Sequence, residues 1–84
     1  MIMRKEIENR LVELAKNIEK LSKKLKPGFY AEHISNQLMR SSTSAALNYG
    51  EAQAAESKKD FIHKNSIVLK ELRESQISLK LLSD

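Results

Sequence analysis

The chain has 84 residues, of which 40% are hydrophobic and 31% are charged, and a formal net charge of +4 at pH 7. A chain of this length forms at most one domain, here 1–84, and buries only roughly 60 to 65% of its unfolded surface, so its core benefits from a partner subunit. The absence of Cys excludes disulfides, thiolate zinc sites and Cys nucleophiles. Two Gly, one Pro and no Trp, beside abundant Leu, Lys, Glu and Ser, favour an all-α protein.

The N-terminal stretch MIMRKEIENR leads into a charged helix. Because it carries Glu6 and Glu8, it does not have the pattern of a signal peptide. No run approaches the ~18 apolar residues of a membrane-spanning helix. We therefore expect a soluble, cytoplasmic protein.

The first predicted helix covers about residues 3–26. Its apolar residues alternate spacings of four and three, which is typical of one helix of a bundle or coiled coil. Lys26-Pro27-Gly28 ends this helix, because Pro does not fit a helix interior and disfavours helical geometry at the residue before it. The apolar stripe consists of Ile7, Leu11, Leu14, Ile18, Leu21 and Leu25.

The second predicted helix covers about residues 29–55, and small residues occupy two of its faces. One face carries Ile34, Leu38, Ser41, Ala45, Asn48 and Ala52, and the other carries Met39, Thr43, Ala46, Leu47, Gly50 and Ala54. Small side chains allow neighbouring helices to approach closely. We expect this helix to be the most buried of the three.

The third predicted helix covers about residues 57–83. Ser57 and Asp60, three residues apart, suit an N-terminal capping box. The apolar stripe that follows is Phe61, Asn65, Val68, Leu72, Ser75, Leu79 and Leu82, widened to one side by Ile62 and Leu69. Ile67, Ile77 and Leu81 point away from this stripe, which predicts that another helix or a partner covers them.

The segment QLMRSSTSAALNYGEAQAAESKKDFIHKNSIVLKELRES resembles the bacterial four-helix-bundle proteins related to those encoded in intervening sequences of 23S ribosomal RNA genes. The resemblance runs from about residue 30 to 84, with Ala52 where many relatives have Gly. It implies an antiparallel up-and-down bundle, pentameric rings as in characterised relatives, and, for one branch, an accessory role beside the reverse transcriptases of diversity-generating retroelements. The fourth helix of that family is absent here, which predicts an open seam with Ile67, Ile77 and Leu81 left exposed. Either the gene product is shortened, or a second subunit covers this seam.

Polar residues on the predicted helices have a structural interpretation. Asn48 and Glu51, three apart, are placed to bond each other or to reach a neighbouring helix. Such buried polar residues fix helix register and oligomeric state. Asn65 and Ser75 have the same interpretation.

Metal binding and catalysis receive little support from the sequence. Asp60 with His63, and Glu32 with His33, pair a carboxylate with an imidazole, but a di-metal bundle needs such motifs on two helices and carboxylates from two others. No phosphate-binding loop, Ser-His-Asp order or pair of catalytic carboxylates is present. We expect no metal, no cofactor and no enzymatic activity.

The excess positive charge lies in the first helix, where residues 1–26 hold eight Lys or Arg against four Glu. Lys5, Lys16, Lys20 and Lys23 form a stripe opposite the apolar seam, and a stripe of this kind suits a phosphate backbone. An ordinary solvated face is the competing interpretation, because Glu6 with Arg10 and Glu19 with Lys23 form pairs along the helix. A ring of copies would multiply the stripe, and binding would then be electrostatic.

Two functions follow as alternatives. The first is an oligomeric scaffold that binds RNA or DNA through the first helix. The second is a protein-binding adaptor whose exposed apolar residues, Ile77 and Leu81 among them, dock a partner helix. A basic amphipathic helix on a membrane is a poorer third interpretation, because the first helix has no aromatic residue and its polar face carries acidic residues.

Overall fold

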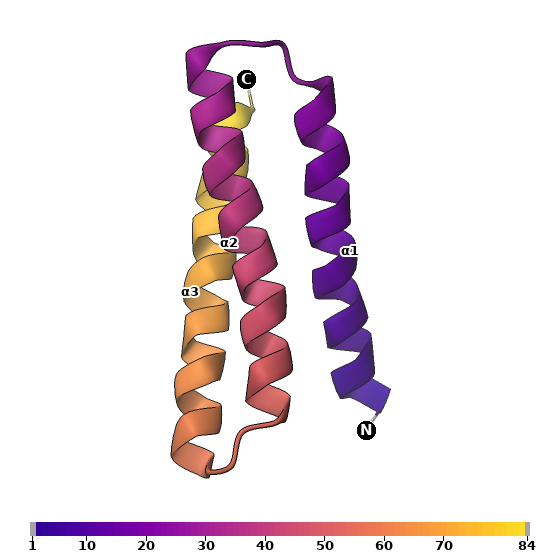
Figure 1. Ribbon diagram of the computed structural model, residues 1–84, viewed down its shortest axis with the longest axis vertical. Helices are drawn as coiled ribbons and strands as arrows, with labels where there is room; N and C mark the ends of the chain where they lie inside the picture. Colours follow the sequence, from indigo (N-terminus) through magenta and orange to yellow (C-terminus); the bar gives the residue numbers. More distant parts are fainter. Residues whose placement is uncertain (1, 84) are drawn as a thin grey trace.

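The computed structural model describes the backbone of residues 2–83 and the side chains of residues 4–83. Within that range the chain forms three helices and no strand: α1 (Ile2–Lys24), α2 (Phe29–Gln53) and α3 (Lys58–Leu82). The helices run up, down and up, so that α1 and α3 point in the same direction and α2 points in the opposite one (Figure 1). The prediction of an all-α, antiparallel bundle with three helices is confirmed.

The helix ends follow from local residue chemistry. Helix α1 ends at Lys24, two residues before the predicted end, because Pro27 already restricts the backbone that precedes it. Helix α2 ends at Gln53 rather than residue 55, and the amides of Ala54 and Ala55 bond carbonyls three residues back, as in a tightened last turn. Helix α3 begins after Ser57, whose hydroxyl accepts a hydrogen bond from the amide of Asp60 at 3.0 Å. The predicted cap of α3 is therefore confirmed.

Helix α2 is the centre of the bundle. It packs against both α1 and α3, and more extensively against α3, whereas no Cα atom of α1 lies within 8 Å of a Cα atom of α3 in the described chain. The core cluster consists of Leu11 from α1, Ala45 and Tyr49 from α2, and Val68 from α3. Leu38 and Ala45 of α2 are fully buried. The expectation that the second helix is the most buried agrees with this arrangement.

The apolar stripes of α1 and α3 are only partly covered. Leu11 and Ile18 are buried, whereas Ile7 is 38% exposed and Leu21 is 37% exposed. On α2, the face that carries Leu47, Gly50 and Ala54 is also exposed, so no helix in the described part of the chain covers it. The bundle therefore leaves apolar surface open on one face of α2 and between α1 and α3.

A candidate helix-binding groove and its polar surroundings

A groove lies between α1 and α3, on the side of the bundle where these two helices are not in backbone contact. We call it the α1–α3 groove. Leu72 forms its floor and packs against the core cluster, while Leu69 on its edge is 69% exposed. The sequence signal for this groove was the widening of the third stripe by Ile62 and Leu69. The groove is lined by Leu14, Leu69, Leu72, Arg73, Ser75, Gln76 and Leu79.

The residues predicted to mark an open seam lie elsewhere. Ile77 is 43% exposed and Leu81 is 47% exposed, but Ile67 is half-buried, so the prediction for Ile67 is only partly met. Leu81 follows Leu72 by nine residues, which turns it about 180° around α3 from the floor of the groove. Ile77 and Leu81 instead border a shallow pocket that Ile34 of α2 also lines. The groove and this α2–α3 surface are therefore separate, in keeping with the sequence, which placed Ile77 and Leu81 away from the stripe that Leu69 widens.

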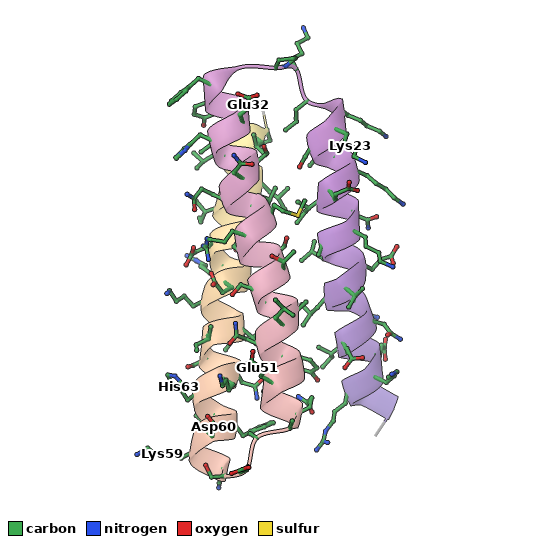
Figure 2. The ribbon with its side chains drawn as sticks, in the orientation of Figure 1. Lys23, Glu32, Glu51, Lys59, Asp60 and His63 are labelled. Atoms are coloured by element: carbon green, nitrogen blue, oxygen red, sulfur yellow. The ribbon has the colours of Figure 1, made fainter. Side chains whose placement is uncertain are left out.

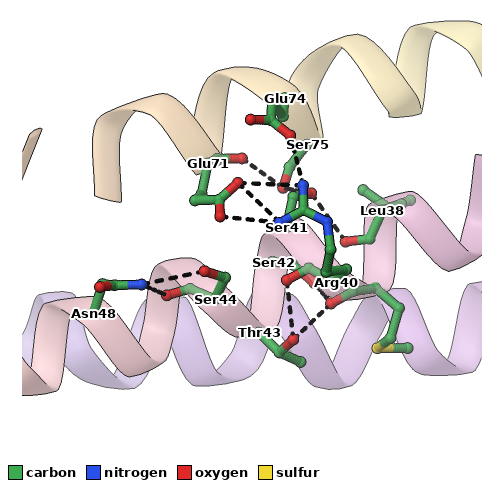
Figure 3. A network of polar contacts seen from close by, with 11 residues as sticks. Leu38, Arg40, Ser41, Ser42, Thr43, Ser44, Asn48, Glu71, Glu74 and Ser75 are labelled. Carbon is green, nitrogen blue, oxygen red and sulfur yellow. Dashed lines mark hydrogen bonds and ion pairs between the residues drawn. The ribbon is translucent and has the colours of Figure 1, made fainter. Parts of the chain in front are cut away.

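An ion cluster joins α2 to α3 near the middle of the bundle (Figure 3). The guanidinium of Arg40 donates to both carboxylate oxygens of Glu71, with a shortest distance of 3.0 Å, and to Glu74 at 2.6 Å. The Glu71 side chain is only 8% exposed. Its burial acts to raise the pKa of Glu71, but the hydrogen bonds from Arg40 and Ser44 and the positive charge of Arg40 together lower it. The cluster therefore holds an ionised carboxylate between the helices.

Two buried hydroxyls form a second link between the same helices. The Oγ atoms of Ser41 and Ser75 lie 2.7 Å apart, and both residues are almost completely buried. The Ser75 hydroxyl also lies 3.0 Å from the carbonyl of Glu71. Ser41 and Ser75 can bond only when they lie at the same level along the two helix axes. This pair and the Arg40 cluster therefore favour one register of α2 against α3. Ser75 therefore bonds across helices, whereas its role in fixing the register stays a prediction.

Of the other predicted polar residues, only Glu51 bonds across helices. Its carboxylate accepts a hydrogen bond from Lys64 of α3 at 2.6 Å, and the pKa of Lys64 is raised by that hydrogen bond and by the charge of Glu51. Asn48 donates to Ser44 of its own helix at 2.8 Å and not to Glu51, and Asn65 donates to the carbonyl of Phe61 at 3.1 Å. Among the side chains that the structure describes, Asn48 and Asn65 therefore do not join helices.

Sequence reasoning did not single out Arg40 and Glu71, the strongest polar pair of the bundle. A signal was present, because Glu71 follows Val68 by three residues and precedes Ser75 by four, which places it on the buried stripe of α3. A carboxylate in such a position needs a cation from the facing helix. The sequence analysis assigned the neighbouring Leu72 to the apolar stripe and did not consider Glu71.

The candidate metal-binding pairs lie far apart. Glu32 is near the start of α2 and Asp60 and His63 are near the start of α3, which are opposite ends of the bundle (Figure 2). Among the residues that the structure describes, no three His, Asp or Glu side chains gather as metal ligands do. The two pairs therefore do not form a joint site.

The proposed basic stripe of α1 is partly neutralised. Lys5 pairs with Glu8 at 3.6 Å, and Lys23 pairs with Glu19 at 2.8 Å, which raises the pKa of Lys23. Within residues 4–83, Lys16 and Lys20 form no ion pair. All four lysines are exposed. Lys16 and Lys20, on adjacent turns of α1, are thus the lysines of the stripe that have no acidic partner within residues 4–83.

A family model described as "23S rRNA-intervening sequence protein" matches residues 4–84. No curated protein and no solved structure gives a match. None of the helices in the described range combines the length and apolar character that crossing a membrane requires.

Proposed function

This chain belongs to the 23S rRNA-intervening sequence protein family, and we propose that it is a non-enzymatic adaptor that binds a further helix in the α1–α3 groove. The observation that carries the proposal is the exposure of the groove. Leu69 is 69% exposed, Leu79 is 36% exposed and Ile62 is 57% exposed, all along one side of α3. Three exposed apolar residues at helical spacing form a seam that an amphipathic helix fits.

The bundle also supplies a rigid frame for such a helix. The Arg40 cluster and the Ser41–Ser75 pair fix α3 against α2, while α1 packs on α2 through Leu11 and Ile18. A helix that enters between α1 and α3 would contact both and bury the half-covered leucines, Leu14 and Leu72. Apolar burial stabilises by roughly 25 cal/mol for each Å² removed from water. The groove therefore offers binding energy without requiring the existing helices to separate.

A selection from displayed helices tests this proposal. The probe is a library of helices of about 25 residues with a fixed apolar stripe and Glu or Lys at each flanking position. Leu69→Asp should abolish capture of enriched helices, whereas Leu47→Asp should not, because Leu47 is 67% exposed on a different face of the bundle. Enriched helices that bind Leu69→Asp as well as the unaltered chain would refute the groove as the binding site. Loss of capture with Ile77→Asp instead would move the site to the α2–α3 surface.

A second candidate is a homo-oligomeric scaffold that binds RNA or DNA through α1. It is favoured by Lys16 and Lys20, which lie one turn apart, are exposed and have no ion-pair partner within residues 4–83. Copies arranged in an oligomer, such as the pentameric ring implied by the resemblance, would repeat this short stripe and increase its attraction for phosphates. This second candidate also requires a cytoplasmic location, where the protein would meet RNA or DNA.

Solution mass and salt dependence test the second candidate. Light scattering should give a closed oligomer, and retention of RNA or DNA should fall steeply as salt concentration rises. Lys16→Glu with Lys20→Glu should remove retention. The matched control is Lys5→Glu with Lys23→Glu, because both of these lysines already pair with Glu. Equal retention by both double variants, or a monomer that retains nucleic acid unchanged, would contradict the scaffold.

A further inference from the structure

We propose that the exposed face of α2 is a self-association surface, on which a second copy of the chain packs with its own α2 running antiparallel. We call this surface the α2 face and define it by Thr43, Leu47, Gly50 and Ala54. The inference extends the homo-oligomeric part of the second candidate, because it assigns a surface to the contact between copies. It is independent of the adaptor function, which uses the α1–α3 groove.

Leu47 projects from the middle of the α2 face. It is 67% exposed, whereas Ala45 is fully buried. Leu47 follows Ala45 by two residues, which turns it about 160° around α2 from the core. Spacings of four, three and four residues place Thr43, Gly50 and Ala54 on the same side of the helix. The α2 face is therefore one continuous strip opposite the core.

Gly50 is the residue of this face that the isolated bundle does not explain. It lies within α2 and its φ is not positive, so its backbone conformation does not require glycine. Of the described atoms, none lies within 4 Å of a Cβ added at this position. Glycine inside a helix destabilises it relative to alanine. A missing side chain at an exposed position suits the close approach of another backbone.

The α2 face is complementary to itself. When two copies pair antiparallel around Leu47, Thr43 of one copy lies level with Gly50 of the other. In the same register, Met39 lies level with Ala54. Larger side chains thus lie opposite smaller ones on both sides of the central leucines, and such alternation lets two helices interdigitate. This self-complementarity identifies a second copy as the occupant.

The edge of the α2 face toward α3 favours the antiparallel direction. Arg40 and Glu51 both lie on this edge, and α3 pairs Arg40 with Glu71 and Glu74, and Glu51 with Lys64. Antiparallel pairing around Leu47 brings Arg40 of one copy to within about 3 Å of the level of Glu51 in the other, at 1.5 Å per residue. Parallel pairing would place equal charges level with each other. Opposite charges across an interface fix the direction of the partner.

The edge toward α1 adds apolar surface. Val12 is 41% exposed and lies on the side of α1 turned away from the α1–α3 groove. The acidic residues on that side, Glu8 and Glu19, pair with Lys5 and Lys23. A second copy would therefore meet Val12 beside charges that are already paired.

Sedimentation equilibrium on two matched variants tests the surface. Leu47→Gln and Leu69→Gln each remove an exposed leucine, at 67% and 69% exposure, from the α2 face and from the α1–α3 groove. We expect the unaltered chain to form a dimer. Leu47→Gln should raise its dissociation constant at least about tenfold, since the change occurs on both copies, and Leu69→Gln less than about twofold.

Three results of this measurement would overturn the inference. They are a chain that stays a monomer at millimolar concentration, a dimer that depends on Leu69 and not on Leu47, and an assembly larger than a dimer. The third result would leave the homo-oligomeric scaffold standing, so the two proposals fail separately.

Gly50→Gln should act in opposite directions on folding and on association. In the isolated bundle the new side chain enters open space, and glutamine favours a helix over glycine, so the melting temperature of the monomer should rise by roughly 2 to 4 °C. In the pair the same side chain occupies the space that the second backbone needs, so dimer formation should be lost. A lower melting temperature, or unchanged dimer formation, would refute close approach at Gly50.

Cross-linking tests the orientation, because the chain has no Cys of its own. A mixture of Thr43→Cys and Gly50→Cys chains should form a disulfide between the two variants, since antiparallel pairing places these positions at the same level. Thr43→Cys alone should not cross-link, because the two copies of position 43 would lie about 10 Å apart along the helix axes. Efficient cross-linking of Thr43→Cys with itself would indicate parallel helices and overturn the antiparallel pair.

Discussion

Replacing two leucines by alanine tests whether the α1–α3 groove is open in the isolated chain. Leu38 is 0% exposed in the core, and Leu69 is 69% exposed on the groove edge. Truncation of a fully buried Leu costs about 2 to 5 kcal/mol, because both transfer energy and cavity formation contribute. For Leu69 no cavity forms and less than a third of the side chain is covered, so the expected cost is about 0.5 kcal/mol.

Urea unfolding followed by circular dichroism measures both costs. A chain of this length has a stability of about 4 to 13 kcal/mol, so Leu38→Ala should remove a large part of it and Leu69→Ala very little. The measurement is made at several protein concentrations, since a partner copy would make the midpoint rise with concentration. A cost for Leu69→Ala close to that of Leu38→Ala would refute the reasoning, because it would mean that Leu69 is covered in solution.

Three further predictions concern the polar contacts. The pKa of Glu71 in the folded chain is below its ordinary value of 4.5. The contribution of this ionised carboxylate to stability is therefore complete above pH 4.5 and is lost as the pH falls through the lower pKa of the folded chain. Glu71→Gln should flatten the acid limb of a curve of unfolding free energy against pH. Ser41→Ala and Ser75→Ala should each lower the free energy of unfolding by about 1 kcal/mol, and the double variant should lower it by less than the sum. Additive losses in this double-mutant cycle would contradict the buried bond between the two hydroxyls. Ser57→Ala should lower thermal stability by about 1 kcal/mol through loss of the α3 cap, whereas Ser57→Gly should lower it by only a few tenths.

Helix existence and order were predictable because the signals are local. Lys26-Pro27-Gly28 separates α1 from α2, and Ser57 caps α3, so breakers and caps placed the boundaries within two residues. The spacing of Leu11, Ile18 and Val68 also identified core positions correctly. These features depend on residues close in the sequence and need no knowledge of how the helices are arranged.

The partition of apolar surface was less predictable, because it depends on which helices are neighbours. Ile77 and Leu69 are both exposed apolar residues of α3, yet one borders α2 and the other borders the groove. Their positions on the helical wheel are known from the sequence, but the side of α2 on which α1 lies relative to α3 is not. That placement is fixed by the packing of both helices on α2.

Polar partners were the hardest to predict. Arg40 and Glu71 are 31 residues apart, and their contact depends on the register of two antiparallel helices. Asn48 stands on a seam position, but its amide is satisfied by Ser44 one turn earlier, since a local bond needs no partner helix. Seam position alone therefore does not distinguish a cross-helix bond from a local one.

Leucine and isoleucine methyl NMR, with a helix selected from the displayed library added in steps, tests the central claim most directly. The account predicts that the methyl signals of Leu14, Leu69 and Leu79 shift with the added helix, while those of Leu47 and Ile77 stay unchanged. Saturating shifts at the groove would establish where the helix binds. Shifts at Ile77 or Leu47 without any at Leu69 would contradict the account, because the helix would then bind outside the α1–α3 groove.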